Sequence, residues 1–377
     1  MRLSIYIFAL FVLVNSSCQN QDKQSNNTSQ SQSFSKIKYA KGFNIEYFAD
    51  YKLVTVFNPW EENTIYNKYR IYYKDTSVSL TGNELVCSII KDKIITLSGS
   101  QIGFLGELNL TDKIIAVSKK EYIFNKTIIE KINSNKIIEL GDESNLNFEK
   151  IYNINPNMLF TTGWNTTNSS YNKIAETGIP VIYLLEWQEN NPLGRAEWIK
   201  FIAAFLNKDK EADSIFSIIE HNYISIKNSL NTKKRPNILH GSLIGGTWYI
   251  PGGNSYIANL YKDAGTNYLW SDNEKTGSLP LKFESVYNKA KNADFWFPML
   301  NINTTEELLN NEERYSLFNT VKSKKIFLAN KMITKYGGND YWEKGVARPD
   351  LILNDLVHIF SNDSLNNDEL FFFKQIY

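Results

Sequence analysis

Apolar positions follow two different periods along this chain. Short runs of aliphatic and aromatic residues, typical of buried strands, alternate with longer segments in which apolar residues recur every three to four positions. From residue 93 onward this alternation predicts parallel sheets with helices on their faces. We expect strands at 94–97, 114–117, 137–140, 158–161, 181–185, 238–240, 295–297 and 326–329. We expect helices at 101–108, 148–153, 196–206, 210–230, 256–263, 283–290, 305–310, 314–320 and 349–360.

The segment before residue 93 has a different pattern. Residues 43–48, 53–57 and 66–74 are rich in Tyr, Val, Ile and Phe, and a turn containing Pro59 separates the second run from the third. This composition predicts a cluster of antiparallel strands. The chain therefore carries an additional N-terminal sheet before its alternating region.

One expected helix is much longer than the others. The segment 210–230 contains no Gly or Pro, and Asp209 and Glu211 lie where the helix dipole favours acidic residues. We interpret it as a rigid strut, 208–232, between an N-terminal α/β lobe at 37–207 and a C-terminal α/β lobe at 233–377. The alternative is an ordinary surface helix, but the two repeated units described in the next paragraph would then have no element that connects them. The predicted fold class is α/β, with two mainly parallel, helix-flanked lobes joined by this helix.

A short phrase occurs twice, once in each expected lobe. Residues 148–153 read FEKIYN and residues 283–288 read FESVYN, and each is followed by an apolar run. The aromatic and aliphatic residues of the phrase share one helix face, and Glu149 and Glu284 fall off that face, towards water. Matched acidic positions on two related helix–strand units indicate docking to a two-fold symmetric partner.

The N-terminus has the pattern of a targeting segment. A basic start and an apolar run from Ile5 to Val14 predict a signal peptide at 1–17, because the run is too short to span a bilayer. Small residues before Cys18 resemble a bacterial lipobox, in which Cys18 would be lipidated; a plain secretory signal is the alternative. Residues 18–36 are mostly polar and predict a flexible tether. We expect a membrane-anchored lipoprotein facing the periplasm.

Composition narrows the function further. The chain has 377 residues, is 42% hydrophobic and 14% aromatic, and has a formal net charge of +1, which indicates a folded protein without a basic surface for nucleic acid. It has only two cysteines and three scattered histidines. This argues against a disulfide framework, a structural zinc site or a metalloprotease, so no metal site built by the protein is expected.

Ligands of open parallel sheets lie beyond the carboxyl ends of the strands. Several aromatic and small polar residues follow the expected strands there, which suits a large, partly aromatic ligand held by stacking and a few hydrogen bonds. Each loop aromatic could instead pack as part of a lid. The candidate ligand-binding residues are Ser100, Gln101, Trp164, Trp187, Trp248, Tyr249, Tyr341 and Trp342.

Arg195 and the histidines leave alternatives open. Arg195 either binds an anionic ligand group or pairs internally with Glu186 or Glu197. His240 ends a strand and can reach the ligand. We expect His221 to face solvent on the long helix and His358 to pack on the last helix.

The order and spacing of several motifs resemble the class III periplasmic substrate-binding proteins of ABC importers for iron-siderophore complexes, haem and cobalamin. The resemblance runs from Ile94 to the C-terminus, and its last motifs resemble the lipoprotein branch of Bacteroidetes-type bacteria. The motifs are Ile94–Ser98, Asn147–Glu149, Asn155–Asn157, Gly178–Val181, Pro192–Trp198, Gly246–Gly253 and Asp263–Gly265. The resemblance implies two lobes joined by one long helix, with the ligand between them. It also implies that Glu149 and Glu284 pair with arginines of a two-fold permease.

The leading hypothesis is a lipid-anchored protein that delivers a chelated iron complex, a siderophore or haem, to the permease dimer of an ABC importer. A corrinoid is the alternative ligand, and in every case the metal arrives inside its chelator, so no cofactor is expected. A hypothesis of another class is a secreted hydrolase that uses a cleft carboxylate such as Glu186. A third is a binding protein of the same fold for bare zinc or manganese, for which a cluster of His and carboxylate ligands is missing. We expect a binding protein and not an enzyme.

Overall fold

The computed structural model describes residues 36–166, 169–230, 235–361 and 367–377. The predicted signal peptide, the lipidated Cys18 and the tether up to residue 35 lie outside these residues. The described residues belong to one compact unit. We call those up to 207 the N-terminal lobe and those from 235 the C-terminal lobe, and the lobe boundaries stay a prediction.

The additional N-terminal sheet is present and has five strands in the order β1-β2-β3-β5-β4. The three predicted strands, β1, β2 and β3, pair antiparallel as expected, and two strands that were not predicted extend the sheet: β5 pairs in parallel with β3, and β4 pairs antiparallel with β5. Alternate residues face inward, and Tyr69 on β3 packs edge-on against Phe205, with ring centroids 5.3 Å apart. The strands are β1 Phe43–Tyr47, β2 Tyr51–Phe57, β3 Ile65–Tyr72, β4 Ser79–Thr81 and β5 Glu84–Ser88.

A parallel sheet forms the centre of the N-terminal lobe, as predicted, in the order β10-β9-β6-β7-β8. Helices cover both of its faces, because α3 and α4 share one apolar cluster with it while α1, α2 and α5 share the other. The strands are β6 Ile94–Thr96, β7 Ile114–Val117, β8 Ile138–Glu139, β9 Met158–Thr162 and β10 Val181–Leu184. The helices are α1 Gly99–Glu107, α2 Lys126–Asn133, α3 Phe148–Ile154, α4 Ser169–Glu176 and α5 Pro192–Phe205.

The C-terminal lobe contains a smaller parallel sheet, β14-β11-β16, extended by a parallel bridge between Trp296 and Ile326. An antiparallel sheet, β12-β13-β15, and a pair, β17-β18, complete it. The strands are β11 Asn237–His240, β12 Ser242–Ile244, β13 Thr247–Pro251, β14 Asn267–Tyr268, β15 Ser278–Leu281, β16 Phe295–Phe297, β17 Phe327–Leu328 and β18 Lys374–Gln375. The helices are α7 Tyr256–Asp263, α8 Phe283–Ala290, α9 Thr305–Asn311, α10 Asn319–Lys322, α11 Lys344–Ala347 and α12 Pro349–Ser361.

The repeated phrase forms equivalent structure in both lobes. It folds as α3 followed by β9, and as α8 followed by β16. In each lobe this strand pairs in parallel with the first strand of the parallel sheet, β6 or β11, whose other neighbour is the second strand, β7 or β14. The two lobes therefore share a strand order, which confirms the helix–strand repeat.

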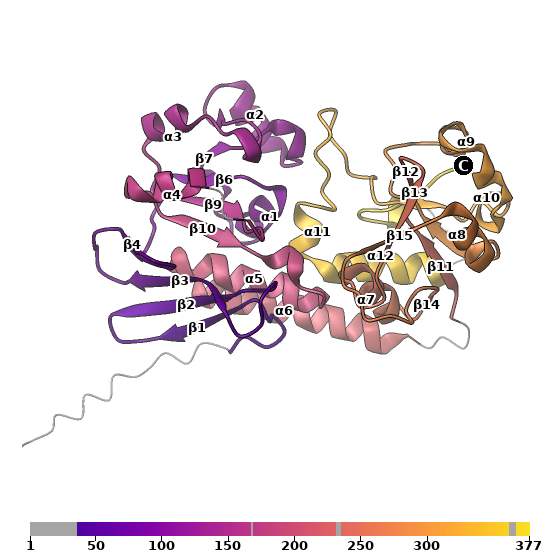
Figure 1. Ribbon diagram of the computed structural model, residues 1–377, viewed down its shortest axis with the longest axis horizontal. Coiled ribbons are helices and arrows are strands. Elements are labelled where there is room, and N and C mark those ends of the chain that lie inside the picture. Colours follow the sequence, from indigo (N-terminus) through magenta and orange to yellow (C-terminus); the bar gives the residue numbers. More distant parts are fainter. Residues whose placement is uncertain (1–35, 167–168, 231–234, 362–366) are drawn as a thin grey trace, which may run out of the picture. The chain divides into compact units, whose positions relative to one another are not determined.

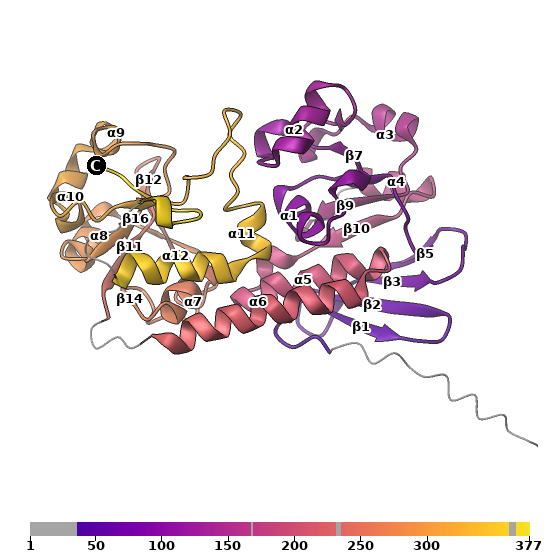
Figure 2. The same ribbon diagram turned by 180° about the vertical axis from the view of Figure 1, so that it is seen from behind.

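One long helix, α6 (Asp209–Ser229), connects the lobes as predicted. Its buried residues Ala212, Phe216, Ile219 and Tyr223 recur every three to four positions, which makes one apolar stripe. The first half of α6 packs on α5 and its second half on α12 (Figures 1 and 2). Because one apolar cluster contains residues of both lobes, the lobes share a continuous core.

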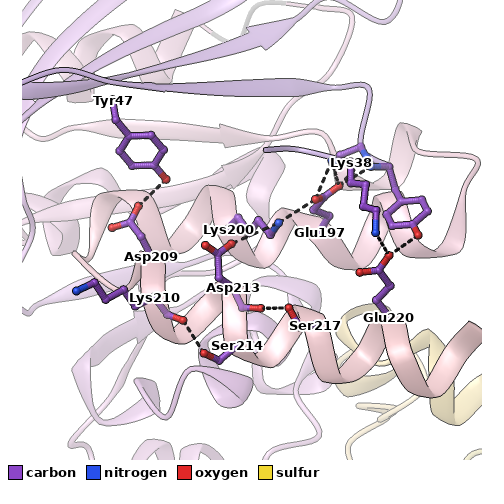
Figure 3. Close-up of polar contacts among 12 residues, drawn as sticks. Lys38, Tyr47, Glu197, Lys200, Asp209, Lys210, Asp213, Ser214, Ser217 and Glu220 are labelled. Carbon is purple, nitrogen blue, oxygen red and sulfur yellow. Dashed lines mark hydrogen bonds and ion pairs between the residues drawn. The ribbon is translucent and has the colours of Figure 1, made fainter. Parts of the chain in front are cut away.

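Two carboxylates fix the first described segment of the chain. The amides of Lys38, Tyr39 and Ala40 donate to Glu197 on α5, at 2.7–3.0 Å (Figure 3). The Lys38 ammonium and the Tyr39 hydroxyl also bond to Glu220 on α6. Glu197 thus satisfies backbone N–H groups of this segment, and Glu220 binds two of its side chains, so the segment is held on α5 and α6.

A loop of the C-terminal lobe reaches the N-terminal lobe. This loop, 331–343, rises above α11 in Figures 1 and 2 and is pinched by a bridge between Ile333 and Asn339. A Cβ on Gly338 would lie 1.9 Å from the Ile123 carbonyl oxygen, and one on Gly103 of α1 would lie 2.1 Å from that of Glu343. Only glycine allows these close approaches, which hold the loop and α11 against the N-terminal lobe.

Candidate functional site

A cavity of about 710 Å³ opens at the carboxyl ends of the parallel strands. The N-terminal lobe contributes residues 187–190 and Arg195, which follow β10. The C-terminal lobe contributes residues at the carboxyl ends of β11, β16 and β17, the first turns of α7, and part of the loop 331–343. Pockets for drug-sized ligands typically measure roughly 300–1,000 Å³ and are mostly apolar, so this cavity has the size and character of a ligand site.

A second cavity of about 370 Å³ adjoins the first. It lies at the N-terminal end of α1 and is lined by Ser98–Ser100, Glu121 and Tyr122. Both cavities share Arg195, Gly337, Asn339 and Trp342 as lining residues. The two hollows therefore form one continuous site, with Arg195 at their boundary.

The structure brings four of the predicted ligand residues to this site. Trp187, Tyr341 and Trp342 line the larger cavity, and Ser100 lines the smaller one. Trp342 is 47% exposed and lines both cavities. The Ser100 hydroxyl donates to Glu186 at 2.6 Å, which orients it beside α1.

An aromatic wall of Trp60, Trp164 and Trp187 extends from the larger cavity. Trp164 does not line the cavity, but its ring lies 4.9 Å from that of Trp187 and is half exposed. Trp60, from the loop between β2 and β3, contacts Trp187 from another side, at 6.2 Å. The additional N-terminal sheet thus contributes a ring to the rim of the site, which sequence reasoning missed because it assigned that sheet no role.

Trp248 and Tyr249 do not line the site. Trp248 is fully buried, its indole N–H donates to the His240 carbonyl at 3.0 Å, and its ring stacks on Trp296. The expectation that it contacts ligand is therefore corrected: it is a core residue, since the alternation of β13 turns Trp248 and Ile250 inward. Tyr249 points the other way, is 40% exposed, and lines neither cavity.

Gln101 is also a structural residue. Its side chain is 1% exposed, and its Oε1 accepts from the amides of Leu97 and Ser98 at 2.8 and 3.3 Å. It closes the turn between β6 and α1 in the manner of a helix capping box. The predicted ligand contact is corrected here too, because both cavities are lined without it.

The two suggested internal partners of Arg195 are engaged elsewhere. Glu197 accepts the amides of the N-terminal segment and pairs with Lys200 at 3.0 Å, and Glu186 accepts from Ser100. No ion pair or side-chain hydrogen bond joins Arg195 to any residue that the structure describes. Its guanidinium lies over the ring of Tyr256, 4.9 Å from the centroid.

His240 lines the deep part of the larger cavity. Its Nδ1 and the Tyr261 hydroxyl are 2.7 Å apart, and burial lowers the pKa of His240 to about 3, so the ring is neutral. His221 is exposed, as predicted, and His358 is half-buried with its Nδ1 beside the Asn354 carbonyl. Within the described residues, no group of three or more His, Cys, Asp or Glu side chains could hold a metal ion.

The two repeat glutamates are exposed in both lobes. Glu149 lies in the first turn of α3, and Glu284 in the first turn of α8, with its side chain 70% exposed. Glu284 lies 3.5 Å from Arg314, which is itself bound by Glu312 at 2.8 Å. Exposed pairs of this kind contribute at most about 1 kcal/mol, so Glu284 can exchange its partner easily.

Sequence reasoning missed several polar residues of the site, among them Tyr256 and Asn330. Tyr256 begins α7, where it shares an apolar helix face with Leu260 and therefore has the signature of a core residue. Asn330 lies two residues after the end of β17, and the rule that ligands lie beyond carboxyl ends could have found it.

Comparisons with known proteins agree with this architecture. Residues 94–332 match the model of the periplasmic binding protein family, so the matched region begins after the additional N-terminal sheet. An uncharacterized lipoprotein of Methanocaldococcus jannaschii is 28% identical over 359 residues, which cover 89% of this chain and 84% of that protein. Within the described residues, no helix has both the length and the apolar character that a membrane span requires.

Solved structures show the same fold at low sequence identity. A possible iron-binding periplasmic protein of Staphylococcus epidermidis is similar with a TM-score of 0.56 and 18% identity, over 72% of this chain and 100% of that one. The periplasmic haem-binding protein HutB of Vibrio cholerae gives 0.55 and 15%, over 69% and 98%. The catecholate-siderophore binding protein VctP of Vibrio cholerae gives 0.53 and 14%, over 71% and 94%.

Proposed function

This chain belongs to the periplasmic binding protein family, and from that premise we propose that it delivers a chelated iron complex, a ferric siderophore or haem, to an ABC importer. The observation that carries the proposal is the cavity of about 710 Å³ between elements of both lobes. Its aromatic rim can stack on a planar or ring-bearing chelate, while backbone and polar groups orient it. Similar structures include a possible iron-binding protein, a haem-binding protein and a catecholate-siderophore binding protein.

A corrinoid is the second candidate ligand. The aromatic wall of Trp60, Trp164 and Trp187 offers stacking surface to any large macrocycle, and the pairs in it have centroid separations of 4.9 and 6.2 Å. Equilibrium dialysis against haemin, ferric siderophores and cyanocobalamin separates the candidates, since only the transported class should be retained at sub-micromolar concentration.

The protein is a substrate-binding protein and not an enzyme, as its family is. The carboxylate suggested for hydrolysis, Glu186, is only 4% exposed, and it accepts from Ser100 at 2.6 Å. Its role is therefore to fix the start of α1 at the rim of the smaller cavity. We retain no hydrolase hypothesis.

Glu149 and Glu284 are the residues that we propose dock to the importer. They occupy equivalent, exposed positions on helices α3 and α8, so a two-fold permease can meet both with the same arginine-rich surface. The matching position in each lobe supports this role, because the repeat is preserved in the fold as well as in the sequence.

Uptake of radio-iron by cells tests the importer role. A variant with Glu149→Ala and Glu284→Ala should lose uptake and keep its affinity for the chelate, since neither residue lines a cavity. Glu306→Ala, at an exposed position of α9 outside the repeat, is the matched control and should transport normally. Loss of chelate affinity in the double variant would contradict the docking role.

We propose that the lipid anchor is attached to Cys18. The match with a named lipoprotein supports it, and the polar stretch after Cys18 would separate the compact unit from a membrane. Cells expressing the full chain should incorporate labelled palmitate, and Cys18→Ala should abolish the labelling. Labelling that survives this substitution would contradict an anchor at Cys18.

A further inference from the structure

Three polar side chains meet at the boundary of the two cavities without bonding to one another. Arg195 comes from α5 of the N-terminal lobe, Tyr256 from α7, and Tyr341 from the loop before α11. All three line the larger cavity. A positive charge and two phenols from three separate elements thus converge on one point between the lobes.

Arg195 is an uncompensated charge. A guanidinium stays protonated in proteins, and taking it partly out of water is costly unless an anion or acceptors replace the lost hydration. The Nε of Arg195 is buried without a partner, and its contact with the Tyr256 ring supplies no acceptor in the guanidinium plane. The fork of N–H groups, which matches a carboxylate in geometry, is therefore unused.

The two phenols are unused in the same way. The Tyr256 residue is 8% exposed, and its hydroxyl is buried without a hydrogen-bond partner. Tyr341 is 5% exposed, and its hydroxyl has no hydrogen bond to a described residue, although only the Tyr256 hydroxyl is also fully buried. Buried donors are normally satisfied, so the Tyr256 hydroxyl and the Arg195 Nε indicate a missing acceptor, and Tyr341 offers a further donor near them.

No neighbouring carboxylate supplies that acceptor. Among the residues that the structure describes, Glu189 is the only acidic one that lines the larger cavity, and its Oε1 already accepts from the amides of Lys41 and Gly42 and from Trp198. Glu186 is bonded to Ser100. Glu121 lines the smaller cavity but makes no ion pair with Arg195, so the guanidinium has no anionic partner among the described residues.

We infer that Arg195, Tyr256 and Tyr341 form an oxyanion subsite that binds a charged oxygen group, a carboxylate or catecholate, at the edge of the chelate. This inference rests on the proposed function and makes it more specific: the transported chelate is anionic. Because one member lies on the N-terminal lobe and two lie on the C-terminal lobe, the bound oxyanion would bridge the lobes. The protein would then discriminate against chelates of the same size that carry no net negative charge.

The test measures affinity for probes of two charge classes. Haemin and a ferric tris-catecholate carry anionic oxygens, whereas ferrichrome and cyanocobalamin have no net negative charge. Titrations use the chain without residues 1–35, because the described residues form one compact unit without them. We expect an anionic probe to bind at least tenfold more tightly than both neutral probes, with an affinity that falls as salt is raised.

Two substitutions examine the subsite itself. Arg195→Gln should weaken binding of the anionic probe by roughly 30-fold, since a charge-assisted bidentate interaction is lost. Tyr256→Phe should weaken it about fivefold and leave resistance to urea unchanged or raised, because an unsatisfied buried hydroxyl is removed. Arg70→Gln is the matched control: Arg70 also lies over a tyrosine ring, at 4.8 Å, but pairs with Glu84 outside both cavities.

The outcomes separate the inference from the proposed function. Tight binding of a neutral chelate, with unchanged affinity in Arg195→Gln, would leave the function standing and overturn the oxyanion subsite. Arg195 would then be a packing residue, and Tyr256→Phe would lose stability and not affinity. If none of the probes binds, both proposals are overturned.

Discussion

Glu343 provides a sharp test of how the lobes are held together. It belongs to the C-terminal loop that reaches across, is 4% exposed, and accepts from the Phe124 and Asn125 amides of the N-terminal lobe at 2.7 and 3.3 Å. Burial raises the pKa of this carboxyl from 4.5 to about 7, helped by the nearby Asp340 charge and opposed by the two amides. The perturbation is Glu343→Gln, which keeps one acceptor for these amides and removes the titration.

The sign and size of the pH effect on stability follow from the difference in the pKa of Glu343 between the folded and the unfolded chain. Above pH 4.5 the unfolded chain loses this proton, while the folded protein keeps it until pH is about 7. The contribution of Glu343 to the free energy of unfolding is therefore largest below pH 4.5, falls as pH rises to about 7, and is constant beyond. Each pKa unit corresponds to about 1.4 kcal/mol, so the total fall is about 3 kcal/mol.

Urea denaturation at several pH values from 4 to 8 measures this contribution. The difference in unfolding free energy between the wild type and Glu343→Gln should decrease by about 3 kcal/mol across the range. Glu306→Gln, on an exposed part of α9, supplies the control and should show a difference that changes far less. A flat difference for Glu343→Gln would refute the claim that its carboxyl is buried against the N-terminal lobe.

Three further substitutions probe the packing around the site. Gly103→Ala should lower the free energy of unfolding by about 3 kcal/mol in urea denaturation, because the new Cβ would lie 2.1 Å from a carbonyl oxygen. Gly106→Ala is the control and should cost nothing, since the nearest atom to its new Cβ lies 4.0 Å away. Trp248→Ala should cost roughly 3–5 kcal/mol by the same assay while ligand affinity of the folded protein is kept; reduced affinity at full folding would return Trp248 to the site. Trp60→Ala should weaken chelate binding several-fold in fluorescence titrations with little change in stability, and unchanged affinity would exclude the N-terminal sheet from the site.

Much of the fold could be predicted because local pattern and tertiary structure agree in it. The alternation of strand and helix from residue 93 and the long helix α6 are confirmed. The strands β4 and β5 were missed: Ser79–Thr81 has three residues and is exposed throughout, whereas Glu84–Ser88 does alternate buried and half-buried positions. The pairing of β5 depends on β3, and the parallel register between Lys68 and Glu84 is set by tertiary packing that a hydrophobic period does not encode.

Some helix ends are determined by the local sequence, and others depend on tertiary packing. The helix α5 begins at Pro192, earlier than predicted, with Asn191 accepting from the Leu193 amide at 2.9 Å. This start signal was present in the sequence as an Asn cap followed by Pro. By contrast, the expected helix 314–320 divides at Phe318, whose extended backbone and buried ring depend on packing against Trp248 and Trp296.

The candidate site was harder to predict than the fold. The rule about carboxyl ends located the correct loops, and Trp187 and Trp342 line the larger cavity. It could not decide which of two adjacent residues in β13 faces inward, because that depends on how the sheet β12-β13-β15 packs on the core. The lack of an internal partner for Arg195 likewise appears only when the contacts of Glu186 and Glu197 are known.

Intrinsic tryptophan fluorescence of the chain without residues 1–35, titrated with haemin, ferric siderophores and cyanocobalamin, tests the central claim most directly. Trp187 and Trp342 line the cavity and Trp164 stacks on Trp187, so a bound chelate should quench the emission. The account predicts saturable quenching by an anionic iron chelate at sub-micromolar concentration, reduced in Arg195→Gln. The absence of saturable quenching by every chelate would contradict it.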